Sequence, residues 1–361
     1  MPLRYCAGGS ETLARLEDLY ERRAQDRVCA VFELRTWALA RFAQEHPAGF
    51  CEYPDPRERA AFWDAHLRER SAILDDSVPA AYLSEFDQGL YGGLLGGEVR
   101  FLSDPETGWI SSMVPPLFSD LSESRDLAFD PDHPWFRRYL EQMDVFVGRA
   151  AGKFGISHFI LIDSLNFVFE CVGATRTYLA LIEAPEEVRR LIDFAFDLNV
   201  AVQEAFFERV PLVEGGTCSN MVGWVRGRIV SESVDPFHMT SVGDFERWGR
   251  GPVERMLGHF DGGVLHIHGN GRHLLEAVAD IPGLKAIYLG DDRGYAPAFT
   301  VLPDLKRRAG DVPLVLAVPY EEFCRALGGH TVLGGVQYVV TGTPSADAAN
   351  ETMDRVRKYA V

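Results

Sequence analysis

The chain has 361 residues, 47% of them hydrophobic and 25% charged, and a formal net charge of −17. This balance is typical of a globular protein with a sizeable core, and the negative charge argues against nucleic acid or an anionic membrane surface as a partner, because both would repel the chain. No apolar run approaches the roughly 18 residues of a membrane-spanning helix, and the first ten residues lack the apolar stretch of a signal peptide. We therefore expect a cytoplasmic protein whose six cysteines are free thiols.

The first predicted element is a helix over residues 10–27, which Ser10 can cap and in which leucines recur near the helical period. From residue 28 onward, short apolar runs alternate with longer amphipathic stretches, as in repeated βα units around a parallel sheet. The eight predicted strands cover residues 29–35, 80–85, 158–163, 212–214 with their continuation, 264–268, 286–289, 313–317 and 336–340. The clearest helices cover residues 185–208 and 345–359, and residues 97–135 are expected to form a long loop. This pattern predicts an α/β fold, a (β/α)8 TIM barrel over residues 28–361 preceded by an N-terminal helical extension over residues 1–27.

Polar side chains gather at the carboxyl ends of five of these strands. They are Glu33, Arg35, Glu85, Asp87, Asp163, Asn166, His266, His268, Asp291 and Asp292. The loops that follow the strands of a parallel barrel converge on this rim, so active sites form there. The alternative is that strand ends are polar in any protein.

His266 and His268 alternate along their predicted strand, so both side chains point to the same face of the sheet. Two neighbouring imidazoles can hold one metal ion, or an anionic substrate when they are protonated. The strand runs into residues 269–271 (GNG), a turn that lets the backbone approach closely. Two rim histidines with ordinary hydrogen-bond partners are the alternative interpretation.

Residues 231–236 (SESVDP) contain a second candidate group, which we place in a loop before that strand. Glu232 and Asp235 are hard oxygen donors, and either could complete a metal shell or act as a general base. The alternative is a capping or turn role, which an Asp-Pro pair favours.

Several segments resemble successive landmarks of the uroporphyrinogen decarboxylase superfamily. They are residues 184–192 (APEEVRRLI), 233–236 (SVDP), 244–248 (DFERW) and 265–269 (LHIHG). The likeness extends over residues 28–361 and implies a (β/α)8 barrel with its cleft at the C-terminal face. The superfamily includes cofactor-free porphyrinogen decarboxylases and zinc-dependent methyltransferases that work with corrinoid proteins.

The resemblance to the decarboxylases is incomplete. Arg35 matches the first arginine of their substrate-carboxylate motif, but Leu39 stands where the second arginine belongs. Phe169 falls at the substrate-facing tyrosine, Asp235 falls near the active-site serine, and Asp87 corresponds to the essential aspartate. With one matching arginine on an acidic chain, we do not expect an octacarboxylate substrate.

The resemblance to the methyltransferases concerns their zinc ligands, a His-x-Cys pair and a later cysteine. His266 matches the histidine, but His268 replaces the cysteine, and residues 334–340 (GGVQYVV) contain no late cysteine. The two histidines with Asp235 or Glu232 would then hold zinc or another divalent transition metal in a different site.

Our leading hypothesis is an enzyme that performs metal-assisted methyl transfer or demethylation on a small molecule, with a corrinoid protein or a thiol as partner. Asp235 would be a third ligand or a base, Arg35 and Asp87 would orient the substrate, and Asp163 would take part in catalysis. We expect five further residues to contact the substrate, namely Glu33, Asn166, Phe169, Asp291 and Tyr320. The alternatives are a decarboxylase that needs no cofactor and a binding subunit without chemistry; a homodimer is compatible with each.

Overall fold

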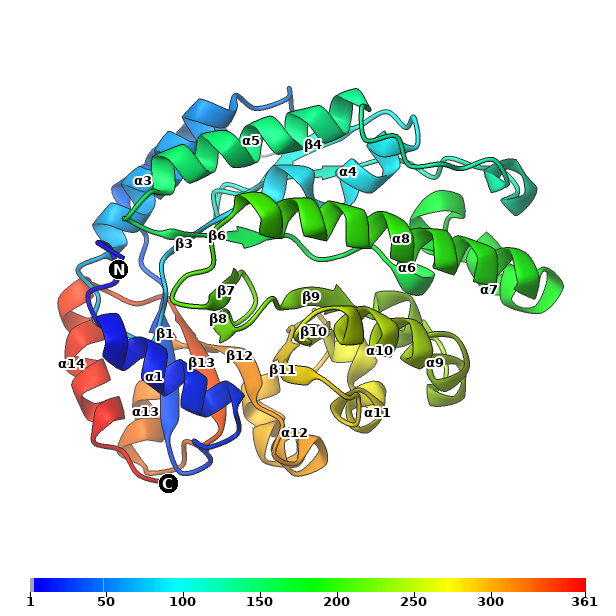
Figure 1. The fold of residues 1–361 in the computed structure, drawn as a ribbon. Coiled ribbons are helices and arrows are strands. Elements are labelled where there is room, and N and C mark those ends of the chain that lie inside the picture. The colour runs from blue at the N-terminus through cyan, green and yellow to red at the C-terminus, as the bar shows by residue number, and fades with distance from the viewer. Residues whose placement is uncertain (1–2, 48) are drawn as a thin grey trace.

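The computed structural model describes residues 3–47 and 49–361. Its largest sheet has six parallel strands. In spatial order the strands are β1 (Val28–Phe32), β13 (Val336–Thr341), β12 (Leu314–Pro319), β11 (Leu284–Leu289), β10 (Gly263–Ile267) and β9 (Val230–Ser233). Several of them are near-continuous apolar runs, such as VQYVVT and LVLAVP, because both faces of a parallel sheet are covered. Figure 1 shows the strands in the interior with helices outside them.

A second sheet has four strands in the order β3 (Ala80–Tyr82), β6 (Gly155–His158), β7 (Gly216–Ser219) and β8 (Gly223–Arg226). Its first three strands are parallel, and β8 runs antiparallel to β7. Isolated hydrogen bonds tie it to both edges of the larger sheet. The Leu161 N–H donates to the Ser231 carbonyl over 2.8 Å beside β9, and the Asp76 N–H donates to the Ala30 carbonyl over 3.0 Å beside β1.

Helices follow most strands and pack on the outside of the sheets. They are α1 (Gly9–Tyr20), α2 (Trp37–Glu45), α3 (Pro56–Arg70), α4 (Asp87–Leu94), α5 (Pro134–Ala150), α6 (Ser164–Val172), α7 (Ala174–Glu183), α8 (Pro185–Arg209), α9 (Val242–Trp248), α10 (Arg250–His259), α11 (Leu275–Ala279), α12 (Leu302–Ala309), α13 (Tyr320–Gly328) and α14 (Ala346–Arg357). Two of these helices begin as predicted. Pro185 lies in the first turn of α8. At the start of α14, the Ser345 hydroxyl accepts a hydrogen bond from the Ala348 N–H over 3.1 Å.

The α/β class and six of the eight predicted strands are confirmed, as β1, β3, β10, β11, β12 and β13. The strand predicted at residues 158–163 lies earlier, at β6. The strand predicted at residues 212–214 with their continuation lies in the continuation, at β7, and Val213 itself makes only an isolated bridge. Residues 230–233 form β9 rather than the loop we expected. All four residues of this strand, VSES, are buried. We expected a loop because a polar sequence usually indicates exposure to solvent.

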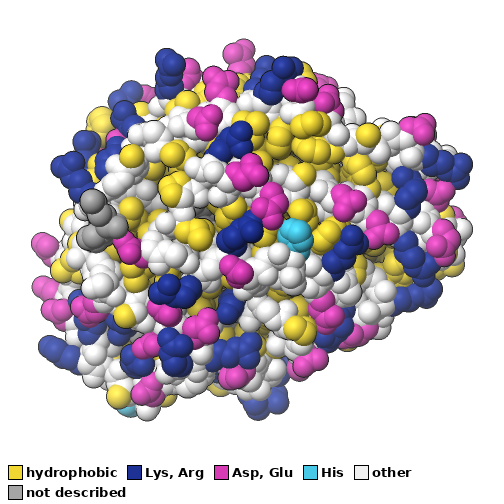
Figure 2. Space-filling model, viewed as in Figure 1, with side chains coloured by type: hydrophobic (Ala, Val, Ile, Leu, Met, Phe, Trp, Pro, Cys, Tyr) yellow, Lys and Arg dark blue, Asp and Glu magenta, His cyan; other side chains and the backbone are white. Residues whose placement is uncertain are grey.

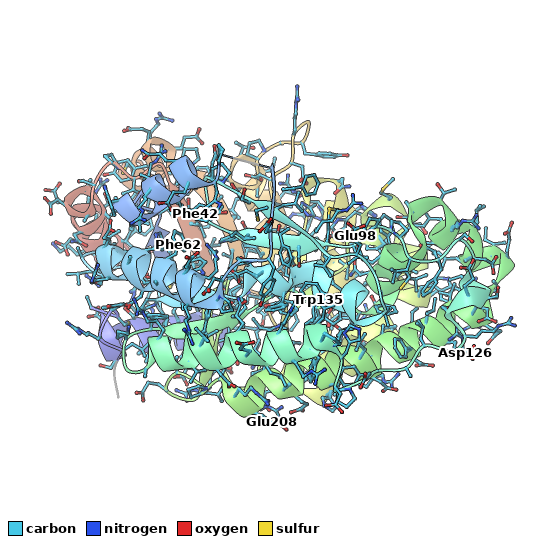
Figure 3. All side chains as sticks on the ribbon, turned by 90° about the horizontal axis from the view of Figure 1, so that it is seen from above. Phe42, Phe62, Glu98, Asp126, Trp135 and Glu208 are labelled. Carbon is cyan, nitrogen blue, oxygen red and sulfur yellow. The ribbon has the colours of Figure 1, made fainter. Side chains whose placement is uncertain are left out.

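Residues 97–135 also contain more structure than the predicted loop. The strands β4 (Arg100–Ser103) and β5 (Ile110–Met113) form an antiparallel hairpin, and β2 (Gly49–Cys51) pairs with β4. Figure 3 shows the labelled Phe42 and Phe62 side by side on α2 and α3 beside this sheet, with ring centroids 5.1 Å apart. Four-residue strands are too short for an alternating pattern to distinguish them from loop.

The predicted helix over residues 10–27 ends at Tyr20 in α1. The Tyr20 hydroxyl donates to the Val222 carbonyl over 2.7 Å, and Arg15 pairs with the buried Asp76 at 2.6 Å. These contacts attach α1 to both sheets. Among the described residues, no helix is long and apolar enough to cross a membrane.

The space between the sheets is filled beneath the carboxyl ends of the strands. Cys29, Val264, Ala286 and Val315 pack there with Trp224, all of them buried. His266 is the next residue after Val264 on the same face of β10, so the apolar filling ends where the histidines begin. The outer surface carries acidic and basic side chains intermingled over the face shown in Figure 2.

Candidate functional site

Three side chains converge where β9 and β10 end. His266 belongs to β10 and His268 follows it, while Asp235 opens the short 3-10 turn Asp235–Met239 that follows β9. The two strands pair in parallel with Ser233 opposite His266, so their carboxyl ends meet. The Asp235 Oδ1 atom lies 3.6 Å from His266 Nε2 and 3.9 Å from His268 Nε2. These three atoms all lie within 4.8 Å of one another, so they could hold a single metal ion.

The electrostatics of this group favour a cation. The two distances from Asp235 Oδ1 are too long for hydrogen bonds, and this oxygen is buried without a hydrogen-bond partner within the described part of the chain. Burial lowers the pKa of His266, although the charge of Asp235 opposes that shift. A neutral imidazole keeps the lone pair that a metal needs. A carboxylate and two imidazoles form a donor set that zinc and other divalent transition metals accept.

A second carboxylate orients His268. The His268 Nδ1 atom lies 3.0 Å from Asp292 Oδ1, and the Gly269 N–H donates to Asp292 Oδ2 over 2.6 Å. Because a carboxylate only accepts, His268 Nδ1 donates to Asp292, and Nε2 is the nitrogen that faces Asp235. This arrangement is typical of metal-binding histidines.

The sequence interpretation missed His238, a third imidazole beside Asp235. Its Nδ1 atom lies 3.5 Å from Asp235 Oδ1, and only 2% of its side chain is exposed. Burial lowers the pKa of His238 to about 4, so the ring is neutral. A histidine three residues after an acidic turn residue was the available signal, since a tight turn places both on one side.

Asp163 and Glu232 form a buried pair between β6 and β9. Burial raises the pKa of both carboxyls, and the charge of Asp163 and a hydrogen bond with it raise that of Glu232 further. When both are ionised, neither Glu232 oxygen has a donor among the described residues, so one shared proton satisfies the pair. Glu232 therefore does not join the three-residue metal group that we expected it to complete.

Asp87 and Glu170 are two further carboxyl groups with raised pKa values. Burial raises the pKa of Asp87 to about 7, with a further contribution from the charge of Glu170, and burial alone raises the pKa of Glu170 to about 7. Burial raises the pKa of Tyr91, and the charges of Asp163, Glu232 and Asp87 raise it further. Asp87 thus interacts electrostatically with another carboxyl group, and the pKa of each is about 7.

Other predicted residues take different places. Glu33 and Arg35 are exposed after β1. Desolvation by the surrounding protein nevertheless raises the pKa of the Glu33 carboxyl. Tyr288, opposite His266 in β11, has its pKa raised by burial and by the charges of Glu33 and Asp291.

Four of the predicted substrate contacts have structural partners. The Asn166 amide donates to the Ser233 carbonyl over 2.6 Å, and Asp291 Oδ1 accepts from the Ala298 N–H over 2.7 Å. The Phe169 ring lies against that of Tyr178 with centroids 6.3 Å apart. The Tyr320 hydroxyl lies 3.1 Å from Thr352 Oγ1 and holds α13 against α14. The structure does not bring Tyr320 to the metal group.

Among solved structures, the fold is similar to that of a methyltransferase from Methanosarcina mazei. The likeness covers 96% of this chain and 98% of that chain, with a TM-score of 0.61 and 13% sequence identity. No family model matches the sequence, and neither does any curated protein. At this identity the comparison shows the fold alone.

Proposed function

We propose that this chain is a metal-dependent enzyme that transfers or removes a methyl group of a small molecule. Its divalent transition metal, with zinc as the first candidate, would be held by Asp235, His266 and His268. The observation that carries this proposal is the convergence of one ligand atom from each of these three residues within 4.8 Å of one another, around an Asp235 oxygen that is buried without a hydrogen-bond partner in the described part of the chain. The fold shared with a methyltransferase supports methyl transfer as the reaction.

The resemblance in sequence extends this proposal to the uroporphyrinogen decarboxylase superfamily, and with it the closure of the two sheets into one (β/α)8 barrel. A corrinoid protein as methyl donor or acceptor, a homodimer and a cytoplasmic location belong to the same proposal. The donor set departs from the His-x-Cys pattern of the zinc methyltransferases, since His268 stands in place of the cysteine. Activation of a thiol therefore does not carry over with the fold.

The bound ion would supply a Lewis acid that polarises a substrate oxygen or nitrogen. Side chains of the protein would orient the ligands, bind the substrate and transfer protons. Asp292 holds the proton of His268 away from the site, and the exposed Arg35 can pair with an anionic group of the substrate. Asp87 and Glu170 exchange protons near neutral pH, so either can protonate a leaving group.

The metal content of the purified protein tests the proposal. After reconstitution with Zn²⁺ and removal of excess ion, we expect about one zinc per chain, and much less in His266→Ala and Asp235→Ala. His273→Ala is the matched control, because its ring is exposed and lies 2.9 Å from the Thr240 carbonyl. Zinc content that is equal in all four proteins, or absent from the unmodified chain, overturns the proposal.

A cofactor-independent decarboxylase is the second candidate. The two buried carboxyl groups with pKa values of about 7 favour it, because loss of CO2 leaves a carbanion that must take up a proton. Turnover of a carboxylate substrate by metal-free protein, abolished in Asp87→Ala, would support this candidate over methyl transfer.

A further inference from the structure

His238 occupies the fourth side of the space around Asp235. Three imidazole nitrogens surround the one oxygen Asp235 Oδ1, at 3.5 Å for His238 Nδ1, 3.6 Å for His266 Nε2 and 3.9 Å for His268 Nε2. The His238 and His268 rings stand edge to face, with centroids 5.7 Å apart. We propose that His238 is a ligand of the same ion, which makes the site one of three imidazoles and one carboxylate.

The distances fit a shared ion better than hydrogen bonds. Ligand atoms bound at about 2.1 Å to a tetrahedral ion lie roughly 3.4 Å apart, close to the separations of His238 and His266 from Asp235 Oδ1. A hydrogen bond between an imidazole nitrogen and a carboxylate would be about 2.7–2.9 Å long. His238 Nδ1 must still move toward the other two imidazoles, since it is not part of the tighter three-atom group.

The surroundings of His238 hold its ring in this orientation. A side-chain carbon at Gly271 would lie 2.1 Å from His238 Cδ2 and 2.4 Å from its Nε2, so the ring packs against bare backbone on that side. The opposite edge, with Nδ1, faces Asp235. The GNG turn after β10 thus makes room for an imidazole that comes from the turn after β9.

The four-ligand site rests on the proposed function and narrows the class of ion that the protein can bind. Nitrogen and oxygen donors without thiolates suit borderline ions such as Zn²⁺, Co²⁺, Fe²⁺ and Ni²⁺, whereas soft ions prefer cysteine or methionine sulfur. Four protein ligands also require that a substrate enter as an additional ligand, which zinc permits by expanding to five-coordination.

Cobalt titration tests the inference, because the visible absorption of Co²⁺ reports the number and type of its ligands. His238→Phe removes both nitrogens and keeps a flat ring against Gly271, and His238→Asn keeps a donor near the position of Nδ1. His273→Phe is the matched control and His266→Ala the reference for a lost ligand. Thermal unfolding without metal verifies that each variant folds, and His238→Gln replaces His238→Phe if the latter does not.

We expect His238→Phe to weaken Co²⁺ binding more than about 100-fold, beyond the roughly 10–100-fold loss that an indirect partner causes, and to change the visible spectrum. His238→Asn should bind Co²⁺ more tightly than His238→Phe, because it keeps a donor atom at this position. If His238→Phe alters affinity but leaves the spectrum unchanged, or alters neither while His266→Ala abolishes binding, the inference is wrong and the three-ligand site stands. If the unmodified chain binds neither Co²⁺ nor Zn²⁺, the proposed function fails as well.

Discussion

Two groups of titratable side chains lie near the carboxyl ends of the strands, and desolvation has opposite consequences in them. In the histidine cluster (Asp235, His238, His266 and His268), desolvation lowers the pKa of His238 and His266, which favours neutral imidazoles. In the carboxyl cluster (Asp87, Asp163, Glu170 and Glu232), desolvation raises the pKa of every member, so protons are taken up. The first cluster could therefore hold a metal ion, whereas the second takes up protons.

The largest expected effect is the stabilisation of the histidine cluster by metal. Zn²⁺ at 1,000 times its dissociation constant should raise the free energy of unfolding by about 4 kcal/mol, because the ion binds the folded chain alone. Denaturant unfolding with Zn²⁺ and with a chelator measures the difference. In Asp235→Ala the difference should vanish, and its persistence there would place the ion elsewhere.

The carboxyl cluster predicts the opposite kind of response, to pH. Between the ordinary carboxyl pKa of about 4 and the value of about 7 for Asp87 and Glu170, these two groups bind more protons in the folded chain than in the unfolded chain. Their contribution to the free energy of unfolding should therefore fall as pH rises through this window, whereas His66, His158 and His238, whose pKa values burial lowers, contribute in the opposite direction. Equilibrium unfolding of the unmodified chain and of Asp87→Asn at pH 5 and pH 8, in the presence of a chelator, isolates the contribution of Asp87.

Replacing Glu232 by Gln should make the change in stability from pH 5 to pH 8 more positive than in the unmodified chain, because it removes a carboxyl group whose pKa burial raises and supplies an amide donor to Asp163 at every pH. Glu123→Gln is the surface control, since Glu123 is exposed in a short turn. The same pH dependence in Glu232→Gln and in the unmodified chain would contradict the shared proton.

A smaller effect is expected from the partner of His268. Asp292→Asn should weaken zinc binding by about 10–100-fold, since it removes the negative charge beside His268 Nδ1 and leaves one oxygen for two donors, His268 Nδ1–H and the Gly269 N–H. Competition with a chromophoric chelator measures the affinity. Asp291→Asn, one residue earlier and engaged with Arg272, provides the comparison and should change the affinity little.

The smallest expected effect concerns Tyr91. Its hydroxyl is buried without a hydrogen-bond partner in the described ranges 3–47 and 49–361. Tyr91→Phe should leave the free energy of unfolding unchanged or raise it by up to about 1 kcal/mol, because no bond is lost with the hydroxyl. A loss above 1 kcal/mol at pH 5 would show that Tyr91 bonds to the carboxyl cluster.

The sequence alone determined the elements whose signals are local. Apolar runs identified β10 to β13, caps identified the starts of α8 and α14, and the two-residue period placed His266 and His268 on one face of β10. Each of these follows from neighbours a few residues apart, which hydrophobic periodicity and capping rules describe.

The tertiary structure decided what those elements bring together. Parallel pairing of β9 with β10, with Ser233 opposite His266, carries Asp235 and His238 to the two histidines. It also buries Glu232 against Asp163, although β9 looks like a polar loop in the sequence. The register between strands and the burial of a side chain are set by packing across the whole chain, so no local pattern around residues 231–238 could have shown them.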